Sequence, residues 1–189
     1  MEYKCIFAGF GGQGIISMGT LLTYAGMLDG KQVLFFPSYG VAMRGGTANC
    51  TVIVSDAEIA SPVVDVPDVL VAMNSPSLDL FEPKVAPRGI VMINAGMIGR
   101  KLARPDVRAV YLNASGIAQA CGDGRMANMA MIGGLLRVTG MVSMDSVGRA
   151  MSKALPAKLH KLIGKNMEVM KLGFEQAQPT APVAADAAR

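Results

Sequence analysis

Short apolar runs, each bounded by glycine, proline or polar turn residues, recur along the chain as far as Leu112. They are four to six residues long and rich in valine, isoleucine and phenylalanine, which is typical of buried strands. Residues 14–28 form a longer run that is apolar nearly all round and free of proline, so they predict a buried helix directly after the first strand. The predicted strands are residues 4–8, 32–36, 49–54, 69–73, 89–93 and 109–112, with a short return strand at 58–61.

After Leu112 the pattern changes to longer segments with helical spacing, separated by glycine and proline. Because strands come first and helices are concentrated in the C-terminal half, the sequence predicts an α/β, Rossmann-like three-layer fold with a mainly parallel sheet. A single domain of residues 1–176 is expected, followed by a flexible tail at 177–189 that lacks an apolar face. The predicted helices are 114–120, 126–138, 144–155 and 157–174, with a short one near 78–81 that follows the cap Asn74 and Pro76.

The bulk composition adds the expectation of partner subunits. Hydrophobic residues make up 51% of the 189 residues and charged residues 17%, which excludes a disordered chain. The 15 methionines exceed what gap filling needs, and thioethers suit surfaces that repack against a partner. No apolar run approaches the roughly 20 residues of a bilayer-spanning helix, and the N-terminus shows no secretory signal. We therefore expect a cytoplasmic protein without membrane contact.

The distribution of charge and the spacing of the cysteines argue against further classes of protein and of binding site. The net charge is +4, but lysine and arginine are dispersed and tryptophan is absent, so the pattern favours an anionic small ligand or an acidic partner over nucleic acid. Cys5, Cys50 and Cys121 are far apart in the sequence and form no C-x-x-C pair. They predict neither a disulfide framework nor a zinc or iron–sulfur site within this chain, and we expect buried thiols instead.

A glycine-rich loop follows the first predicted strand and opens the first helix. Its sequence, GFGGQG, matches the G-x-G-x-x-G pattern, in which unpaired helical N–H groups hold a phosphate or a carboxylate. The acidic residue that an NAD site needs after the second strand is absent, and there is no Gly-Lys-Ser/Thr motif. The alternative to ligand binding is that the glycines only allow the helix to pack tightly on the sheet. Such packing does not explain a polar side chain at the start of a helix, so Gln13 favours contact with a ligand or a subunit. The candidate contact residues are Gly11, Gly12, Gln13 and Gly14.

A second loop, residues 38–47, follows the second predicted strand and begins at the same edge of a doubly wound sheet. It contains tyrosine, methionine and arginine together with three glycines, and it is longer than most loops that only connect two strands. Its single arginine stands beside two glycines, where a guanidinium and backbone N–H groups can meet an anion together. A surface loop with a solvated arginine is the alternative. The candidate contact residues are Ser38, Arg44, Gly45, Gly46 and Thr47.

Five segments carry a family resemblance, in the order GFGGQG, PSYGVAMRGGTAN, IVSDAEIASPVV, RMANMAMIGGLLRVTG and KNMEVMKLGFE. With these segments the chain resembles the gamma subunit of 2-oxoacid:ferredoxin oxidoreductases, the 2-oxoglutarate and branched-chain enzymes most of all. The resemblance covers residues 4–174, and the second loop is its most specific part.

The resemblance implies that this chain is one subunit of an oxygen-sensitive, multi-subunit enzyme of anaerobic metabolism. In that family a 2-oxoacid is decarboxylated on thiamine diphosphate, electrons pass to ferredoxin, and the acyl group leaves on coenzyme A. The implied partners are alpha and beta (thiamine-binding) subunits and a ferredoxin-like delta subunit, which hold or share thiamine diphosphate, Mg²⁺, [4Fe–4S] and coenzyme A. This chain is expected to hold no catalytic residue, metal or cofactor of its own and to be inactive alone. It would contribute to assembly and, through the two loops, to coenzyme A contact.

Three other readings remain open at this point. A matching subunit of an indolepyruvate oxidoreductase, which acts on aryl pyruvates, fits the same motifs. A free-standing nucleotide-binding or NAD-dependent Rossmann-like protein would use the first glycine loop alone. A structural module would use both loops only for protein contact.

Isolated polar residues in the late helices have simple explanations. We expect His160, among lysines, to be solvated rather than catalytic. Asn128 and Asn166 stand among apolar helical positions, and each is expected to tie a loop backbone to the core. The late methionines fit either core packing or a soft subunit interface; they are Met126, Met129, Met131, Met141, Met144 and Met151.

Overall fold

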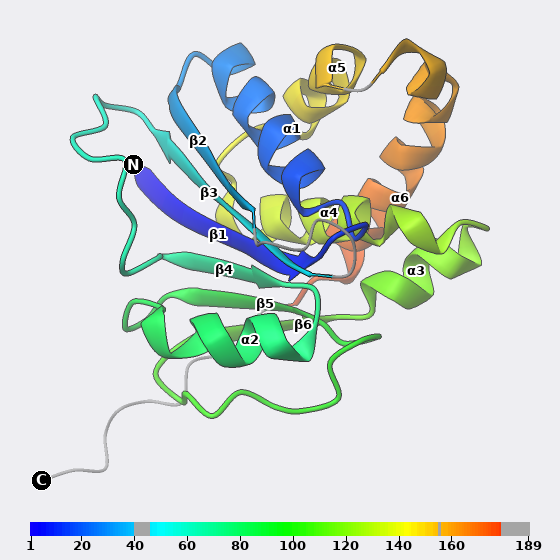
Figure 1. The fold of residues 1–189 in the computed structure, drawn as a ribbon. Coiled ribbons are helices and arrows are strands. Elements are labelled where there is room, and N and C mark those ends of the chain that lie inside the picture. The colour runs from blue at the N-terminus through cyan, green and yellow to red at the C-terminus, as the bar shows by residue number, and fades with distance from the viewer. Residues whose placement is uncertain (40–45, 155, 179–189) are drawn as a thin grey trace, which may run out of the picture.

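A six-stranded sheet forms the centre of the computed structural model, which describes residues 1–39, 46–154 and 156–178 (Figure 1). Strands β1, β4, β5 and β6 run parallel, whereas β3 runs antiparallel to both of its neighbours, β1 and β2. The sheet is therefore mainly parallel, as predicted. In spatial order the strands are β2 (Gln32–Tyr39), β3 (Thr47–Ser55), β1 (Glu2–Phe10), β4 (Val69–Ala72), β5 (Ile90–Asn94) and β6 (Arg108–Leu112).

Strand β3 departs from the expected arrangement. The predicted strand, helix and strand at 4–8, 14–28 and 32–36 would form a βαβ unit. In the structure, however, β3 lies between β1 and β2 and pairs with both. The second predicted loop therefore belongs to an antiparallel β2–β3 hairpin. The predicted return strand at 58–61 has no strand structure. A period-2 pattern identifies strands, but it does not determine which strands pair or in which direction.

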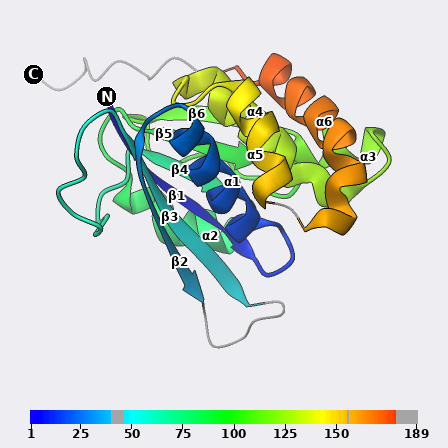
Figure 2. The ribbon, with the colours of Figure 1, turned by 90° about the horizontal axis from the view of Figure 1, so that it is seen from above.

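Helices cover both faces of the sheet unequally (Figures 1 and 2). Helix α2 (Ser75–Phe81) lies on one face, and the other helices lie on the opposite face, where α5 packs on α1 and α6 on α4. This is the three-layer α/β fold that the sequence predicts, with helices concentrated in the C-terminal half. The helices of the thicker layer are α1 (Ile15–Leu28), α3 (Ala114–Ala120), α4 (Ala127–Thr139), α5 (Met144–Ala154) and α6 (Ile163–Gln176).

Successive residues of the central strands enter two separate hydrophobic cores. In β4, Val69 and Val71 join the large core beneath α1 and α4, whereas Leu70 and Ala72 join the smaller core beneath α2. All four side chains are completely buried, because this strand is covered on both faces. Burial on both faces explains why residues 69–73 form a continuous apolar run in the sequence.

The helix ends lie close to their predicted positions. Helix α2 begins at its predicted cap, because the side-chain carbonyl of Asn74 accepts a hydrogen bond from the Ser77 N–H (2.9 Å) and Pro76 occupies the first turn. Helix α4 ends where Gly140 adopts the left-handed conformation (φ 60°). The last predicted helix instead starts as a 3-10 helix, Ala157–Leu162, before α6. Two further 3-10 segments, Glu82–Lys84 and Gly124–Met126, follow α2 and precede α4.

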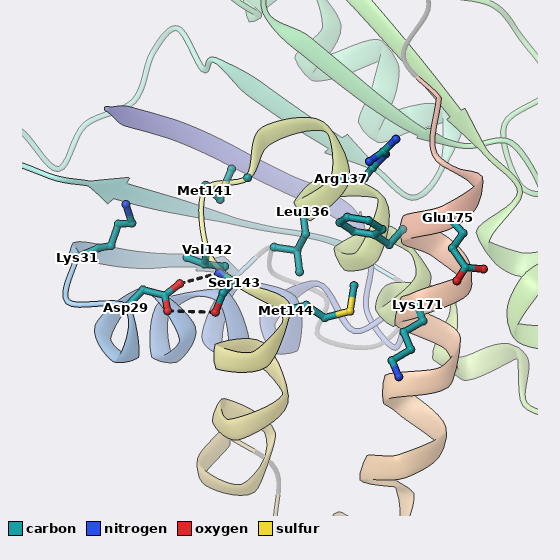
Figure 3. A pocket seen from close by; sticks show the side chains of 12 residues that line it. Asp29, Lys31, Leu136, Arg137, Met141, Val142, Ser143, Met144, Lys171 and Glu175 are labelled. Carbon is teal, nitrogen blue, oxygen red and sulfur yellow. Dashed lines mark hydrogen bonds between the residues drawn. The ribbon is translucent and has the colours of Figure 1, made fainter.

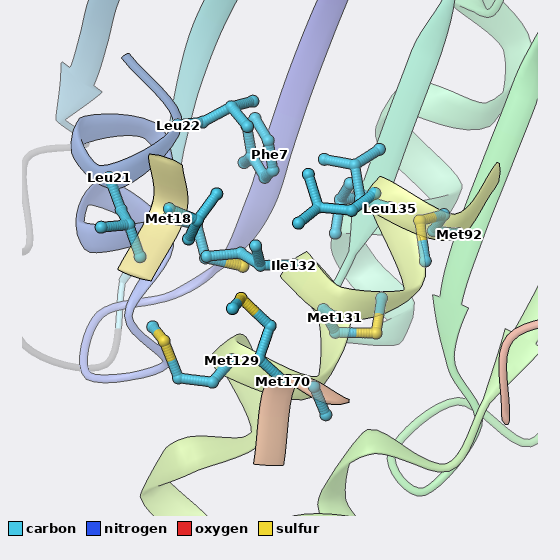
Figure 4. Close-up of a cluster of buried hydrophobic side chains, with 14 of the residues drawn as sticks. Phe7, Met18, Leu21, Leu22, Met92, Met129, Met131, Ile132, Leu135 and Met170 are labelled. Carbon is cyan, nitrogen blue, oxygen red and sulfur yellow. The ribbon is translucent and has the colours of Figure 1, made fainter. Parts of the chain in front are cut away.

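Most of the late methionines belong to the core rather than to a surface. Five of the six named above are at most 5% exposed, and only Met144 is half-buried. Met129 and Met131 lie with Met170 of α6 and Met18 of α1 in one cluster of buried side chains (Figure 4). Their thioethers fill the irregular space where three helices meet, which is the use of methionine that core packing predicts.

Burial also decides the state of the cysteines. Cys5 and Cys50 are fully buried within the sheet, as expected, whereas Cys121 at the end of α3 is half-buried. Burial raises the pKa of the Cys50 thiol to about 12 and raises that of Cys5 as well. Both thiols are therefore protonated at neutral pH.

The domain reaches slightly beyond its predicted end. Ala177, placed in the tail by the sequence, is 2% exposed because it packs near Gly134 of α4. Most of the expected tail, from residue 179 onward, lies outside the described residues. Among the residues that are described, no helix is long and apolar enough to span a bilayer.

Candidate functional site

A small hollow lies at the carboxyl ends of β1 and β4. The chain leaves β1 towards β2 on one side, whereas β4 is followed by β5 on the other, so this is the switch point of the sheet. Ligands of open α/β sheets bind at such points. The hollow measures about 230 Å³ and is lined by residues that follow β1 and β4, by the end of β5, and by the starts of α3 and α4. Among them are Gly12, Gln13, Met73, Asn94, Ser115 and Arg125.

The two predicted loops meet beside this hollow. The Gly11 N–H donates a hydrogen bond to the Gly46 carbonyl (3.0 Å), and Phe10 pairs with Thr47 in the sheet. Ser38 is exposed on the edge strand β2, with β3 between it and the glycine loop. Arg44 and Gly45 lie outside the described residues. The structure thus brings residues 11–14 together with Gly46 and Thr47 and leaves Ser38 apart.

Two glycines of the first loop have left-handed backbone conformations. Gly12 (φ 96°) and Gly14 (φ 75°) alternate with Gln13, a geometry that other residues adopt rarely. A Cβ at Gly12 would meet no described atom within 4 Å, so a ligand or partner can approach the backbone there. At Gly14 a Cβ would collide with the side-chain amide of Asn128.

The Gln13 side chain braces the loop against the next strand. Its carbonyl oxygen accepts hydrogen bonds from the Phe10 N–H (2.6 Å) and the Asn74 side-chain amide (3.1 Å), and its own amide donates to the Met73 carbonyl (3.3 Å). Asn74 also caps α2, so one network fixes the loop, the end of β4 and the start of α2. This gives Gln13 a packing role that the sequence did not indicate. Ligand contact by Gln13 stays a prediction.

Sequence reasoning missed Asn94 and Ser115 in the same hollow. Asn94 ends β5 and is 1% exposed; its amide donates to the Ser115 hydroxyl (3.0 Å), and its carbonyl accepts from the Ser115 N–H (3.3 Å). The pair ties β5 to the first turn of α3. An asparagine at the carboxyl end of a buried strand was the available signal, since that edge is where parallel sheets hold ligands.

Arg125 carries positive charge at the edge of the hollow. It lies in the 3-10 segment before α4 and donates to both carboxylate oxygens of Asp123 (2.9 and 2.7 Å). These hydrogen bonds lower the pKa of Asp123 to about 2, so the pair is fully ionised at neutral pH. The Arg125 side chain is 85% exposed, so its guanidinium can still contact an anion.

Two buried asparagines differ from expectation. Asn128 and Asn166 are 7% and 8% exposed, and neither takes part in the side-chain hydrogen bonds between described residues. No buried side-chain nitrogen or oxygen in that part of the chain lacks a partner, so these amides are not buried unsatisfied groups. They do not tie a loop backbone to the core within that part of the chain. His160, by contrast, is exposed, as predicted.

A larger hollow of about 840 Å³ lies at the opposite, amino-terminal edge of the strands (Figure 3). Leu136 and Met144 are among its apolar lining residues. Asp29, which also lines the hollow, accepts hydrogen bonds from the Ser143 N–H (2.7 Å) and the Ser143 hydroxyl (3.2 Å). These bonds join the turn after α1 to the start of α5. None of the described residues of the two predicted loops lines this hollow.

The comparisons with known proteins agree with this architecture. The family model for pyruvate ferredoxin/flavodoxin oxidoreductases matches residues 4–176, almost the whole described domain. The chain belongs to this family. The match includes both loops of the candidate site and the helices α4 and α6.

Relatives within the oxidoreductase family are subunits of enzymes that act on different 2-oxoacids. Ketoisovalerate oxidoreductase subunit VorA of Methanothermobacter thermautotrophicus is 38% identical over 94% of this chain, which spans only 37% of VorA. 2-Oxoglutarate synthase subunit KorC of Methanocaldococcus jannaschii is 32% identical, with 94% of this chain and 95% of KorC covered. The same domain therefore occurs both as a separate subunit and as about a third of a longer chain.

A solved structure from the oxidoreductase family has the same fold. The gamma subunit of a keto/oxoacid ferredoxin oxidoreductase from Geobacter sulfurreducens superimposes with a TM-score of 0.78 at 26% identity. The match covers 92% of this chain and 97% of that subunit. The α/β fold described above is thus the fold of a gamma subunit.

Proposed function

We propose that the chain is the gamma subunit of a 2-oxoacid:ferredoxin oxidoreductase, which converts a 2-oxoacid to an acyl-coenzyme A and reduces ferredoxin. The observation that carries this proposal is the family match over residues 4–176. Relatives that the chain covers almost completely bear the names of subunits of such enzymes, which supports it further.

The substrate class is a branched-chain 2-oxoacid or 2-oxoglutarate. Similarity to a ketoisovalerate oxidoreductase subunit and to a 2-oxoglutarate synthase subunit supports these two. The oxoacid itself would meet thiamine diphosphate on other subunits, so residues of this chain do not select it.

The residues present do not fit the redox cofactors of such an enzyme. No group of three histidines, cysteines, aspartates or glutamates in the described ranges is placed to hold a metal ion. Cys5 and Cys50 are sealed in the sheet, and Cys121 lies at the end of α3, so they form no set of thiolates for a [4Fe–4S] cluster. Thiamine diphosphate, Mg²⁺ and the clusters would therefore sit on alpha, beta and delta partners.

Within the complex, this chain would help to bind coenzyme A at the carboxyl ends of the strands. Coenzyme A presents phosphates, and glycine-rich helix starts bind phosphates through free N–H groups. Residues 11–14 meet Gly46 and Thr47 there, and Arg44 belongs to the same loop. Ser38 and Gly45 stay in the proposed contact set as members of that loop.

The assembly is tested by isolating the complex through a tag on this chain. We expect thiamine-binding and ferredoxin-like chains to co-purify. The complex should reduce ferredoxin in the presence of coenzyme A and either 2-ketoisovalerate or 2-oxoglutarate. A clear preference for aryl pyruvates would instead support an indolepyruvate oxidoreductase. A chain that purifies alone and is stabilised by NAD or ATP would contradict the proposal.

The coenzyme A contact is tested in the same complex with Arg44→Ala. We expect the apparent KM for coenzyme A to rise by about tenfold, since a guanidinium–phosphate contact contributes on the order of 1–2 kcal/mol. Arg149→Ala, on the exposed face of α5, is the matched control and should leave the KM unchanged. An Arg44→Ala complex with unchanged assembly and unchanged KM would exclude the contact.

A further inference from the structure

The positive charge of the chain is concentrated between residues 146 and 167. This stretch contains five basic residues and no acidic one, whereas the rest of the chain has one more acidic than basic residue. The net charge of +4 therefore comes from α5, the 3-10 helix Ala157–Leu162 and the first turn of α6. Figure 1 shows the connection between α5 and α6 at the outer end of the thicker helical layer.

Four lysines of this stretch form a surface that we call the lysine patch: Lys153, Lys158, Lys161 and Lys165. All four are exposed, and the one salt bridge that the stretch makes with described residues belongs to Arg149 instead, at 3.8 Å from Asp145. Lys158 and Lys161 are one turn apart in a 3-10 helix, so they lie on the same face. The patch therefore presents its positive charge to the surroundings of the protein.

Three of the lysines oppose the local electrostatics of the fold. Lys158 lies in the first turn of its 3-10 helix and Lys165 in the first turn of α6, and neither helix has an acidic residue there. A cation near a helix N-terminus is unfavourable because the helix dipole is positive at that end. Lys161 and Lys165, four residues apart, also repel each other. Folding does not explain these charges, which indicates a role towards a molecule outside the chain.

The chemistry around the lysine patch favours a protein as that molecule. Residues 146–167 contain no aromatic residue, whereas surfaces for single-stranded nucleic acid combine basic residues with aromatic rings that stack on bases. No large apolar side chain among the described residues of this stretch is exposed, so it has no apolar face to insert into a lipid bilayer. A permanent subunit interface also has an apolar core, whereas electron-transfer encounters are small and depend on charge. The patch thus fits an acidic protein that binds and leaves.

We propose that the lysine patch docks an acidic ferredoxin, the protein that accepts the electrons of the reaction. This inference rests on the proposed function, in which ferredoxin is the reactant that is itself a protein and has to leave in every cycle. Complementary charges raise the rate of encounter and orient the two surfaces before contact. Electrons would reach the ferredoxin from a cluster on a partner subunit, so the lysines position the ferredoxin and take no part in electron transfer.

Lys158→Glu/Lys161→Glu in the assembled complex tests the lysine patch. At about 50 mM salt, where surface charges are weakly screened, we expect the KM for an acidic [4Fe–4S] ferredoxin to rise by about tenfold or more, with an unchanged kcat. Added salt should raise the KM of the wild-type complex and lower that of the variant, because it weakens attraction in the first and repulsion in the second.

The melting temperature of the same variant separates docking from folding. Glutamates at the start of a helix are favourable, so the full 189-residue chain with Lys158→Glu/Lys161→Glu should melt at the same temperature as wild type or higher. A lower melting temperature would show that the lysines serve the fold, which would overturn the proposal. Loss of complex assembly would also overturn it, since the patch would then be a permanent subunit contact.

Lys84→Glu/Lys101→Glu is the matched control, because it makes the same change of charge at two exposed lysines beside α2. It should leave the KM for ferredoxin unchanged. Methyl viologen, a small acceptor that needs no docking surface, should be reduced at the same rate by the wild-type complex and both variants. A wild-type complex that reduces neither acceptor would contradict the proposed function. Normal viologen reduction together with an unchanged KM for ferredoxin in Lys158→Glu/Lys161→Glu would overturn the lysine patch alone.

Two further probes test the choice of a protein partner. The full chain is titrated with the ferredoxin, with a single-stranded oligonucleotide and with vesicles of phosphatidylglycerol. We expect the ferredoxin to bind most tightly and its binding to be lost in Lys158→Glu/Lys161→Glu. Tighter binding of the oligonucleotide or of the vesicles, lost in the same variant, would assign the patch to nucleic acid or to a membrane and overturn the proposal.

Discussion

Gly133 in α4 lies directly against the main-chain carbonyl group of Met170 in α6, and a Cβ at Gly133 would overlap that oxygen. Gly173 of α6 has the same relationship to the carbonyl group of Ala130 in α4. The two helices therefore touch backbone to backbone. These glycines belong to the segments RMANMAMIGGLLRVTG and KNMEVMKLGFE, whose packing the sequence alone did not explain.

Gly133→Ala should destabilise the domain by about 3 kcal/mol or more, because the obstacle is backbone that cannot rotate away. Gly164→Ala is the control, since a Cβ at that α6 position meets nothing within 4 Å. It should stabilise the domain by up to about 1 kcal/mol through helix propensity. Urea denaturation followed by circular dichroism measures both, and an equal response of the two variants would contradict the close contact.

Glu82→Gln should cost about 3 kcal/mol, because Glu82 is a buried carboxylate with several partners. It accepts hydrogen bonds from the Arg100 guanidinium (2.6 Å) and the Ala103 N–H (2.6 Å), and it is 3% exposed. Asp79→Asn removes the exposed carboxylate that also contacts Arg100 and should cost less than about 1 kcal/mol. Thermal denaturation would show a much larger loss for Glu82→Gln, and similar losses would refute the role of burial.

Asp29 should make stability depend on pH. Burial tends to raise the pKa of its carboxyl, but hydrogen bonds from Ser146 and Ser143 outweigh burial and hold the pKa below its ordinary value. Because the folded pKa is the lower one, the contribution is present at neutral pH and is lost as the pH falls from roughly 5 through the folded pKa. Asp29→Asn should thus be less stable than wild type at pH 7, by about 1–2 kcal/mol, and closer to it at pH 3.

The control for this pH dependence is Asp145→Asn, because Asp145 is 81% exposed and its only described ion pair is long, at 3.8 Å. The free energy of unfolding of Asp145→Asn should change with pH in the same way as that of the wild type between pH 7 and pH 3. A constant difference between Asp29→Asn and wild type over this range would show that the Asp29 pKa is not lowered in the folded state.

Thiol labelling at pH 8 should proceed in two steps. Cys121 is half-buried and should react with an alkylating reagent in the native protein, whereas Cys5 and Cys50 are fully buried and protonated. Mass spectrometry should therefore find one modified thiol before denaturation and three after it. Native labelling of Cys50 would contradict its placement in the core.

The positions of most helices and strands could be predicted because the spacing of apolar residues in the sequence follows which faces of each element are buried. Val69 and Leu70 are apolar neighbours because both faces of β4 are covered, and Asn74 marks the start of α2 by its capping chemistry. The antiparallel placement of β3 could not be predicted, because pairing depends on contacts between segments distant in sequence.

The candidate site was predictable only in outline. Glycine spacing indicated the loop at residues 11–14, and strand direction placed the second loop at the same edge. The partners of Gln13 come from β4 and α2, and Asn128 reaches Gly14 from the far half of the chain. No local pattern records such contacts, since they arise only when the helices and strands have assembled.

The antiparallel hairpin of β2 and β3 has a consequence for the order of folding. Its strands are neighbours along the chain, so pairing them closes a short loop at little entropic cost, whereas β4, β5 and β6 join β1 through long connections. We expect the hairpin and α1 to form an early nucleus on which β1 aligns. The hydrogen bond between Gly11 and Gly46 would then form with that nucleus, so the two candidate loops would meet before the parallel half of the sheet is complete.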